Sequence, residues 1–376
     1  MALYAGLMSG TSVDGVEAVL LEVDGASTGQ RFQIRAATHT EYPAPLAARL
    51  QAAIANPQSC HLDELGELDA AVGDVFAGAA MGLLKFSGFS AHQVRAVGSH
   101  GQTLLHRPRG VPPFTVQIGD PNRIAERTGI DVVADFRRRD VAAGGEGAPL
   151  VPAFHAAAFG VAGTTRVVAN IGGIANITVL GADGSVTGFD TGPGNCLMDL
   201  WSREHLGQPF DRDGAFAASA EVHLELLRRL LTEPYLKRAP PKSTGRELFN
   251  RGLLDVAMEG LDVTSAAVQS TLCEYTATTI AYGIIFIARA QPEEVLVCGG
   301  GAWNTELLRR LAARMPETRV LTTAHCGIAP QHVEAAAFAW LAHQFLEGRP
   351  GNLTAVTGAR GPRVLGALYA GGVTNP

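Results

Sequence analysis

The segment that decides the fold is LYAGLM (residues 3–8), SGTSVDG (9–15) and VEAVLLEV (16–23). Two apolar runs flank a cluster of glycine, serine and aspartate, which is the pattern of a β-hairpin with a wide polar turn. Glycines in such a turn let backbone N–H groups converge on an anion without obstruction by side chains. The opening of the chain therefore predicts two paired strands whose turn can bind phosphate.

The middle of the chain repeats this arrangement. Strand-like RVVANI (166–171) leads into GGIAN, and a later strand, SVTGFD (185–190), ends in TGPGN (191–195). A third glycine cluster, VCGGGAWN (297–304), joins an apolar strand to a helix. A single glycine turn is more often an ordinary turn, but three in one chain favour a nucleotide bound by two related halves.

Strands and helices alternate along the rest of the chain, which predicts an α/β protein with mostly covered sheets. No clean linker is visible, so we expect the chain to cross between its domains more than once. Residues 101–113 are expected to form a loop. The main helices are expected at 43–56, 62–85, 196–206, 217–232, 264–290, 304–315 and 331–347.

Length and composition limit the classes of function. The 376 residues correspond to about two domains. The net charge is −6 and the 30 basic residues, 27 Arg and three Lys, are scattered, which argues against nucleic-acid and membrane-surface binding. Five dispersed cysteines indicate reduced thiols. The strand-like start and the lack of 18 consecutive apolar residues argue against a signal peptide or membrane span, so we expect a cytoplasmic protein.

Two common phosphate-binding motifs are absent. The sequence has no G-x-x-x-x-G-K-[ST], and none of its lysines, Lys85, Lys237 and Lys242, lies in a glycine turn. The first glycine cluster precedes a strand rather than a helix and lacks G-x-G-x-x-G, which excludes a dinucleotide fingerprint there. A hairpin that binds phosphate through its turn remains.

These residues carry a resemblance to known proteins. GLMSGTSVDGVEAVL (6–20) resembles the phosphate hairpin of the sugar kinase/Hsp70/actin superfamily. Longer strings are similar to the anhydro-N-acetylmuramic acid kinase family of bacterial peptidoglycan recycling, and the similarity runs from about residue 3 to 370. Generic sugar kinases share the hairpin but lack these longer sequence motifs. The longer motifs are GSHGQTLLHRP (98–108), the segment 117–155, NIGGIANIT (170–178), GFDTGPGN (188–195) and FNRG (249–252).

One position departs from the family pattern. The string GGEGAPLVP has Glu146 where the resemblance leads us to expect Gln. A carboxylate there alters local hydrogen bonding, which bears on fine substrate preference rather than on the reaction class.

The resemblance implies a two-domain actin-like ATPase (ribonuclease H-like) α/β fold with the active-site cleft between the domains. The first domain is expected at 1–138 plus about 345–376, and the second at 139–344. Members of the family use ATP and Mg²⁺ to open 1,6-anhydro-N-acetylmuramic acid with water and to phosphorylate O6. The resemblance also implies a homodimer whose small-molecule partners are an amino sugar and ATP.

The catalytic base is expected at Asp190. An aspartate at a strand end is more often a turn former, but the glycines that follow Asp190 open the backbone around it. The resemblance places the family's catalytic aspartate at this position. It would activate a water against the anomeric carbon while O6 attacks the γ-phosphate.

Residues expected at ATP come from the three glycine clusters. Asp14 has a second expected role, holding Mg²⁺ through water, and the alternative is a simple turn residue. The expected ATP-binding residues are Gly10, Thr11, Ser12, Val13, Asp14, Gly15, Val16, Glu17, Gly172, Gly173, Gly299, Gly300, Gly301 and Asn304.

Residues expected at the sugar follow the short strand at 94–100 or open later helices. The histidines have a structural alternative, Asp120 and Arg123 can simply cap and pair, and Glu334 can be a helix-start carboxylate favoured by the dipole. The run Arg137 to Arg139 is expected on a solvated or interdomain face. The expected sugar-binding residues are His100, Gln102, Thr103, His106, Asp120, Arg123 and Glu334.

Two other functions compete with the kinase. One is an exopolyphosphatase-like phosphatase or ATPase of the same superfamily, against which the SHGQT and HRP strings argue. The other is a non-catalytic sugar sensor, against which the intact Asp190 and glycine clusters argue. Dependence of ADP release on an amino sugar distinguishes the kinase from the hydrolase.

Overall fold

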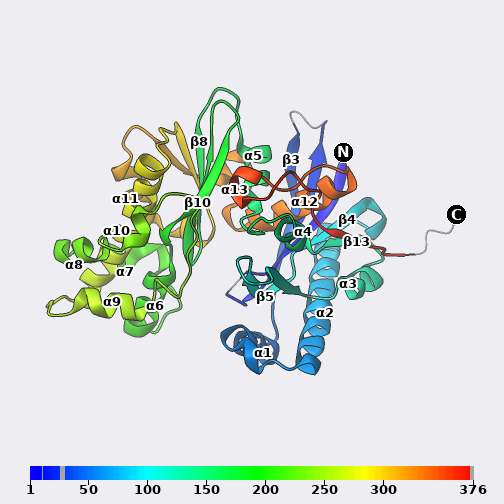
Figure 1. The fold of residues 1–376 in the computed structure, drawn as a ribbon, viewed down its shortest axis with the longest axis horizontal. Helices are drawn as coiled ribbons and strands as arrows, with labels where there is room; N and C mark the ends of the chain where they lie inside the picture. Colours follow the sequence, from blue (N-terminus) through cyan, green and yellow to red (C-terminus); the bar gives the residue numbers. More distant parts are fainter. Residues whose placement is uncertain (11, 26–29, 373–376) are drawn as a thin grey trace. The chain divides into compact units, whose positions relative to one another are not determined.

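The computed structural model describes residues 1–376 apart from 11, 26–29 and 373–376. The chain divides into two compact units (Figure 1). Unit 1 comprises residues 1–158 and 332–376, and unit 2 comprises residues 159–331. Unit 2 is therefore an insertion in unit 1, and the chain crosses between the two twice.

Unit 1 is built on a six-stranded sheet with the order β13-β7-β4-β1-β2-β3. Strands β1, β2 and β3 form an antiparallel meander, β4 and β7 continue parallel to β1, and β13 closes the edge antiparallel to β7. Its strands are β1 Ala2–Met8, β2 Gly15–Asp24, β3 Arg31–Glu41, β4 Val94–Ser99, β5 Gln102–Arg107, β6 Phe114–Ile118, β7 Val132–Ala134 and β13 Ala367–Tyr369. Its helices are α1 Ala44–Ala55, α2 Leu62–Ser87, α3 Pro121–Thr128, α4 Phe136–Ala142, α5 Val151–Phe159, α12 Val333–Leu346 and α13 Thr354–Thr357.

Unit 2 is built on a five-stranded sheet with the order β10-β9-β8-β11-β12. Again the first three strands form an antiparallel meander and the last two run parallel to the first. Its strands are β8 Arg166–Ile171, β9 Ile174–Leu180, β10 Val186–Pro193, β11 Glu294–Cys298 and β12 Arg319–Thr322. Its helices are α6 Cys196–Leu206, α7 Ala215–Ala218, α8 Leu224–Leu230, α9 Arg251–Met258, α10 Ser265–Tyr282 and α11 Thr305–Arg314, with a π-helical turn at Gly283–Ile287.

The two sheets have the same connectivity, which confirms the expected repeat. Five strands of each sheet lie side by side in matching order, β3-β2-β1-β4-β7 in unit 1 and β10-β9-β8-β11-β12 in unit 2. Among these five, only the second strand in chain order, β2 or β9, is antiparallel to the rest. This is the ribonuclease H-like topology, and its duplication defines the two-domain actin-like fold. The two glycine turns occupy equivalent positions: one joins β1 to β2 in unit 1, and the other, Gly172–Gly173, joins β8 to β9 in unit 2.

Helices cover both faces of the unit 1 sheet. Helix α12 packs against β1, β4 and β2, and α2 packs against β1, β2 and β3. The sequence permits a very close approach of α12, because β1 and β4 present Gly6 and Gly98 to it. A Cβ at either glycine would overlap the carbonyl oxygens of Ala335 and Phe338.

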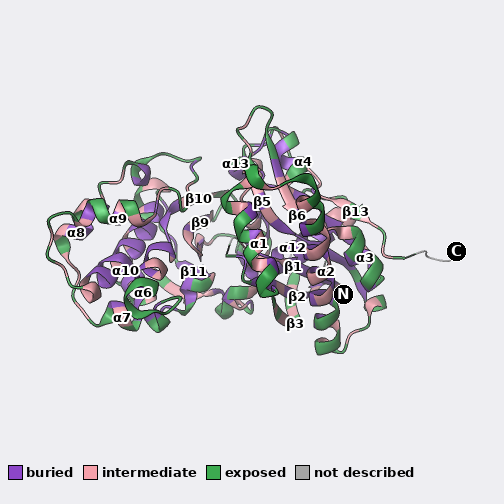
Figure 2. Cartoon of the chain, turned by 90° about the horizontal axis from the view of Figure 1, so that it is seen from below, coloured by how far each residue is buried: buried purple, intermediate pink, exposed green. Residues whose placement is uncertain are grey.

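Helix α2 is long and apolar enough to span a membrane by length and composition alone. Its apolar side is in the unit 1 core, where Leu68, Val72, Phe76 and Leu83 are fully buried. In unit 2, α10 is likewise enclosed, and both helices have a buried side in Figure 2.

The structure corrects three local expectations. Residues 102–107 form strand β5, which pairs antiparallel with β6, rather than part of a loop. The helix expected at 217–232 is two short helices, α7 and α8, separated by residues 219–223. The helix expected at 264–290 stops being α-helical at Tyr282 and continues as a π-helical turn.

The expected domain boundaries at 138 and 345 also differ from those of the compact units. Residues 139–158 and 332–344 belong to unit 1. The physical reason is twofold: α12 covers the unit 1 sheet, and buried Asp140 accepts hydrogen bonds from Asn352 Nδ2 at 2.7 Å and Thr357 Oγ1 at 2.9 Å. Glu334 therefore lies in unit 1.

Candidate active site

The first glycine turn is anchored by Gln102 on β5, one of the residues expected at the sugar. Ser9 Oγ donates to Gln102 Oε1 at 2.6 Å, and Gln102 Nε2 donates to the carbonyl of Gly10 at 3.2 Å. The Gln102 side chain is completely buried, so its amide holds the turn rather than facing solvent. Strand β5 thus fixes the position of the hairpin turn of unit 1.

The turn itself presents backbone rather than side chains. Val13 has a left-handed backbone, φ 57°, and its side chain points into the core together with that of Val16. Only the backbone of these two expected ATP residues can face a ligand. Thr11 lies outside the described residues.

Polar side chains near the tip of the turn are exposed. Ser12 Oγ donates to Asp14 Oδ1 at 2.9 Å, and the carbonyl of Asp14 accepts from Tyr42. Farther along β2, the carboxylate of Glu17 lies 2.7 Å from His39 Nδ1. The exposed carboxylate of Asp14 is compatible with a water-mediated metal contact.

His100 follows β4 and is buried against an arginine. Arg137 Nε donates to His100 Nε2 at 2.9 Å, and Arg137 Nη1 donates to the carbonyl of Gly147 at 2.8 Å. Burial and the nearby Arg137 hold the pKa of His100 well below its ordinary value, so the ring is neutral. Burial lowers the pKa of Arg137 to about 10, while Glu334 and Asp140 oppose that shift.

Arg137 was expected on a solvated or interdomain face, but it is half-buried and its guanidinium forms hydrogen bonds within unit 1, so it is not a solvated side chain. Arg138 and Arg139 are exposed, but Arg137 turns inward toward His100 and Gly147. Neighbours in a helix point about 100° apart, so a run of three arginines cannot all face one side. Arg137 therefore joins His100 and Glu334 in one cluster in unit 1.

Thr103 and His106 lie on β5, opposite β6. Thr103 Oγ1 accepts from Gln117 Nε2 at 3.1 Å, and His106 Nδ1 lies 3.0 Å from Thr115 Oγ1. Burial, with Arg137 next in importance, lowers the pKa of His106. The β5–β6 hairpin thus has a polar face at the residues expected to meet the sugar.

Glu146, the departure from the family pattern, has a partner of opposite charge. Arg109 Nε donates to Glu146 Oε1 at 2.9 Å from the turn between β5 and β6. The carboxylate is thereby compensated at the surface of unit 1.

Asp120 and Arg123 make structural contacts. Asp120 caps α3 by accepting from the backbone N–H of Asn122 at 2.9 Å. Arg123 binds both carboxylate oxygens of Asp74 on α2, at 3.1 and 2.6 Å. These contacts match the alternative of capping and pairing, and a direct sugar contact for either residue stays a prediction.

In unit 2, Asp190 lies near the end of β10 and is mostly buried. Its Oδ2 accepts from the backbone N–H of Thr244 at 3.0 Å, and its carbonyl accepts from Tyr235 Oη at 2.8 Å. Burial raises the pKa of Asp190 to about 6, with Glu247 adding to the rise, while the Thr244 N–H and Lys242 oppose it. A carboxylate with this pKa is ionised at neutral pH yet basic enough to accept a proton.

Sequence reasoning missed the loop that holds Asp190. Residues 239–247 lie between the helices expected at 217–232 and 264–290 and were given no role. In the structure the backbone N–H of Thr244 donates to the carboxylate of Asp190, and Lys242 lies near it. Burial lowers the pKa of Lys242 to about 8, and its ammonium lies 4.7 Å from the ring centre of Tyr235. The sequence offered one indication of this loop's importance, because it contains Lys242, one of only three lysines in the chain.

The remaining glycine clusters of unit 2 lie side by side. The backbone N–H groups of Gly194 and Asn195 donate to the carbonyls of Gly173 and Gly172, which joins TGPGN to the second turn. Gly299, at φ 75°, packs so closely against the end of β8 that a Cβ there would overlap it.

Two polar side chains border this group of turns. Asn304 caps α11, accepting from the backbone N–H of Leu307 at 2.9 Å. The guanidinium of Arg246 would lie only 3.0 Å from a Cβ at Gly173, so a cation borders the second turn.

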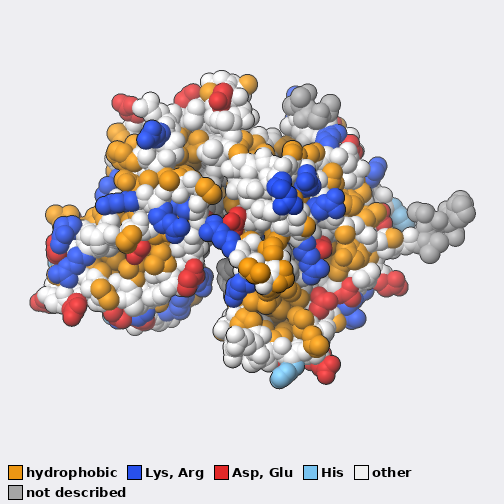
Figure 3. Space-filling model, in the orientation of Figure 1, with side chains coloured by type: hydrophobic (Ala, Val, Ile, Leu, Met, Phe, Trp, Pro, Cys, Tyr) orange, Lys and Arg blue, Asp and Glu red, His pale blue; other side chains and the backbone are white. Residues whose placement is uncertain are grey.

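The described residues contain no group of three or more His, Cys, Asp or Glu side chains able to hold a metal ion. Acidic, basic and apolar side chains are interspersed on the face drawn in Figure 3.

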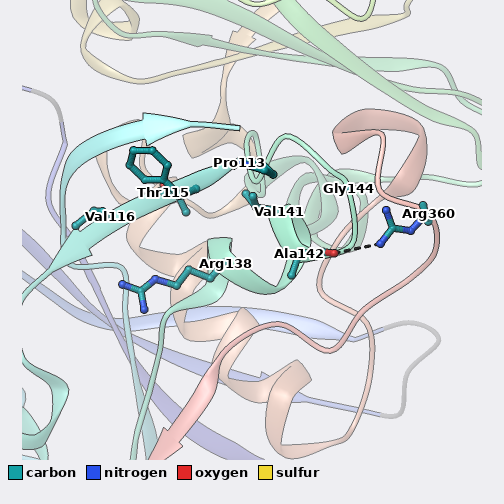
Figure 4. Close-up of a pocket in the computed structure, with 9 residues that line it drawn as sticks. Pro113, Thr115, Val116, Arg138, Val141, Ala142, Gly144 and Arg360 are labelled. Atoms are coloured by element: carbon teal, nitrogen blue, oxygen red, sulfur yellow. Dashed lines mark hydrogen bonds between the residues drawn. The ribbon is translucent and has the colours of Figure 1, made fainter. Parts of the chain in front are cut away.

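A cavity of about 450 Å³ lies between β6 and α4 in unit 1 (Figure 4). Thr115, Val116, Val141 and Ala142 line it, and Arg360 reaches across to donate to the carbonyl of Ala142 at 3.2 Å. None of the residues expected at ATP or at the sugar is among those lining it.

A duplicated ribonuclease H-like fold with glycine turns in both first hairpins defines a member of the actin-like ATPase superfamily. Comparison with known proteins narrows this class. The family profile described as anhydro-N-acetylmuramic acid kinase matches residues 2–371, and the chain belongs to that family.

Two relatives of similar length have the same description as the family. The chain is 52% identical over 369 residues to the anhydro-N-acetylmuramic acid kinase of Xanthomonas campestris pv. campestris (strain 8004), covering 98% of this chain and 97% of that protein. It is 48% identical to the Vibrio parahaemolyticus kinase of the same name, covering 98% of each. Among solved structures, the activator of 2-hydroxyisocaproyl-CoA dehydratase from Clostridium difficile with bound ADPNP is similar with a TM-score of 0.48, at 10% identity, covering 92% of this chain and 96% of that chain.

Proposed function

We propose that this chain is an ATP-dependent kinase that opens 1,6-anhydro-N-acetylmuramic acid with water and phosphorylates O6. The products are N-acetylmuramic acid 6-phosphate and ADP, in the recycling of peptidoglycan. Membership of the family supports the substrate. The observation that supports the reaction is the environment of Asp190, because its carboxylate is mostly buried beside the glycine turns of unit 2 and burial raises its pKa to about 6.

In this mechanism, Asp190 is the general base. It takes a proton from a water whose oxygen forms a bond to the anomeric carbon, and the bond from that carbon to O6 breaks. O6 then forms its bond to the γ-phosphorus of ATP while the bond to the ADP oxygen breaks. The proton on Asp190 leaves to solvent, and the Thr244 N–H keeps the carboxylate oriented through the cycle.

Backbone amides bind the phosphates. The turn around Gly10, Ser12, Asp14 and Gly15 presents its backbone in unit 1, and Gly172, Gly173 and Gly299 to Gly301 do so in unit 2. The positions of Glu17 and Asn304 at the edges of these turns also support roles at the nucleotide. Asp14 would hold Mg²⁺ through water, and the metal would supply positive charge that stabilises the transferring phosphoryl group.

His100, Gln102, Thr103, His106, Asp120, Arg123 and Glu334 are the proposed sugar-binding residues. His100 and the half-buried Glu334 form the best-supported part of this set. Arg137 donates a hydrogen bond to the neutral ring of His100, and the negative charge of Glu334 opposes the lowering of the pKa of Arg137. Gln102, which is completely buried, belongs to this set as a positioning residue: it holds the hairpin turn rather than contacting the sugar. We further propose a cytoplasmic homodimer that binds neither nucleic acid nor membrane, in keeping with the mixed surface charge and the core position of α2.

The experiment that tests the function is a reaction of the purified chain with ATP and 1,6-anhydro-N-acetylmuramic acid in ¹⁸O-water. Mass spectrometry should find one ¹⁸O at C1 and a phosphate on O6. ADP release in the absence of sugar at the same rate would instead indicate a hydrolase. Phosphate on a sugar whose anhydro bond is intact would refute the coupled reaction.

A further inference from the structure

A second, polar cavity of about 170 Å³ lies in unit 1, at the carboxyl ends of the parallel strands β4 and β7. Ser99 and His100 line it from the end of β4, Gln117 from β6, and Asp135 from the end of β7. In open α/β sheets, ligands bind outside the carboxyl ends of the strands. The cavity therefore lies where this fold class places its ligands.

Three polar atoms in the lining of this cavity are buried without a hydrogen-bond partner in the part of the chain that the structure describes. They are Ser99 Oγ, His100 Nδ1 and Gln117 Oε1. Ser99 is only 1% exposed and His100 only 5% exposed. Buried polar groups almost always have partners in folded proteins, so three orphans around one cavity indicate a ligand site.

The hydrogen bonds of the neighbouring atoms show whether each of the three unpartnered atoms can donate or accept a hydrogen bond. Gln117 Nε2 donates to Thr103 and Thr115, so the amide is oriented with Oε1, an acceptor, left over. His100 Nε2 accepts from Arg137, so the proton of its neutral ring is on Nδ1, a donor. The Ser99 hydroxyl can donate or accept. A matching group must both donate and accept hydrogen bonds.

The charges around the cavity exclude an anion. Asp69 and Asp135 both line it, and Asp135, held in a left-handed backbone at φ 62°, pairs with Arg138 at 3.3 Å. One cation and two carboxylates leave no net positive charge for a carboxylate or phosphate. A neutral group therefore fits the lining better than an ionised one.

We propose that this cavity receives the acetamido group of the amino sugar. Its N–H donates to Gln117 Oε1, its carbonyl accepts from Ser99 Oγ and His100 Nδ1, and its methyl group packs on Ile118 and Ala134. This assignment rests on the proposed function and makes Ser99 and Gln117 determinants of sugar specificity.

The test is calorimetric binding of two sugars, which does not depend on turnover. One is 1,6-anhydro-N-acetylmuramic acid, and the other is its counterpart with a hydroxyl in place of the acetamido group. Ser99→Ala should weaken binding of the first about tenfold, because one hydrogen bond is lost, and leave the second nearly unchanged. Gln117→Met, which keeps the length of the side chain, should show the same selectivity.

Thr38→Val is the matched control, because Thr38 Oγ1 on β3 is another buried hydroxyl without a partner among the described residues. It should affect neither sugar. Equal weakening of both sugars by Ser99→Ala, or no weakening of either, would overturn the assignment. If the wild-type chain binds the acetylated sugar selectively through Ser99 but forms no phosphorylated product, the cavity assignment stands and the proposed reaction fails.

Discussion

Units 1 and 2 share one strand order but use it differently. In unit 1 the turn after the first strand is long, running from Ser9 to Asp14, and the polar groups gather at the ends of β1, β4 and β7. In unit 2 the corresponding turn is only Gly172–Gly173, and the proposed base, Asp190, lies within β10, the third strand of the sheet. The two units thus share a strand order, but the polar groups proposed to bind the sugar lie in unit 1 and the proposed base lies in unit 2.

The difference follows from the connections between the strands. Unit 1 inserts the β5–β6 hairpin between its parallel strands β4 and β7, which adds polar side chains from a second small sheet. Unit 2 inserts helices α6 to α10 between β10 and β11, and their connecting loop at 239–247 encloses the carboxylate of Asp190. The insertions, rather than the sheets, decide what each unit does.

The largest expected effect tests whether the base lies in unit 2. Asp190→Asn keeps the size of the side chain but removes the proton acceptor, so kcat should fall by at least about 10²-fold while sugar affinity and Tm change little. Asp199→Asn is the control, because burial also raises the pKa of Asp199 to about 6 in the same unit. A well-folded Asp190→Asn protein with near-normal turnover would move the base elsewhere, and Glu334 of unit 1 would be the next carboxylate to test.

The second prediction tests the boundary of unit 1. Asn352→Ala removes the amide that donates to buried Asp140 and accepts from the Arg363 N–H, which should cost about 1–3 kcal/mol of unfolding free energy. Urea denaturation would measure the loss of unfolding free energy, and a separate calorimetric unfolding experiment would assign that loss to one of the two units. Asn122→Ala, at an exposed position, should change stability far less. Destabilisation confined to unit 2 would contradict the assignment of the C-terminal segment.

The third prediction concerns pH. The pKa of Asp190 is raised to about 6, and its ionised form is the active base, so kcat should fall about tenfold for each pH unit below 6. Activity falls as the pH is lowered because protonation of Asp190 removes the proton acceptor, and activity is fully present above the pKa. A pH profile of kcat checks this. An acid limb centred near pH 4, the ordinary range of an aspartate, would indicate that Asp190 is not the titrating group.

The smallest expected effect compares the two glycine turns. Gly10→Leu has room for its Cβ, since the nearest atom is 3.7 Å away, so unit 1 should fold while ATP binds about fivefold more weakly through lost backbone contacts. Gly82→Leu on α2 is the control, because nothing lies within 4 Å of its Cβ and it is exposed. Nucleotide affinity measured by titration should separate the two. Unchanged affinity in Gly10→Leu would assign phosphate binding to unit 2 alone.

Local sequence signals predicted much of the fold. The hairpin of β1 and β2, the repeat at β8 to β10 and helices α1, α2, α6 and α11 follow from apolar periodicity and glycine placement. Strand β5 was missed because QTLLHR has no regular alternation, and it exists through pairing with β6. Pairing between distant segments is a tertiary effect that a local pattern does not carry.

The site was only partly predictable for the same reason. Asp190 and the glycine turns were reached from motifs and the family resemblance. In the structure the first glycine turn lies in unit 1, whereas Asp190 and the later glycine turns lie in unit 2. The inward turn of Arg137 and the contact of Thr244 with Asp190 depend on packing between segments more than 35 residues apart. Burial, which sets the pKa of Asp190, becomes visible only once the chain is folded.

The insertion of unit 2 has a consequence for synthesis on the ribosome. Helix α12, which covers the face of the unit 1 sheet that carries Gly6 and Gly98, is translated after the whole of unit 2. Unit 2 can complete its fold while the earlier strands of unit 1 still expose an apolar face. Because exposed sheet surfaces favour aggregation, we expect a chain truncated before Val333, which lacks α12, to be insoluble.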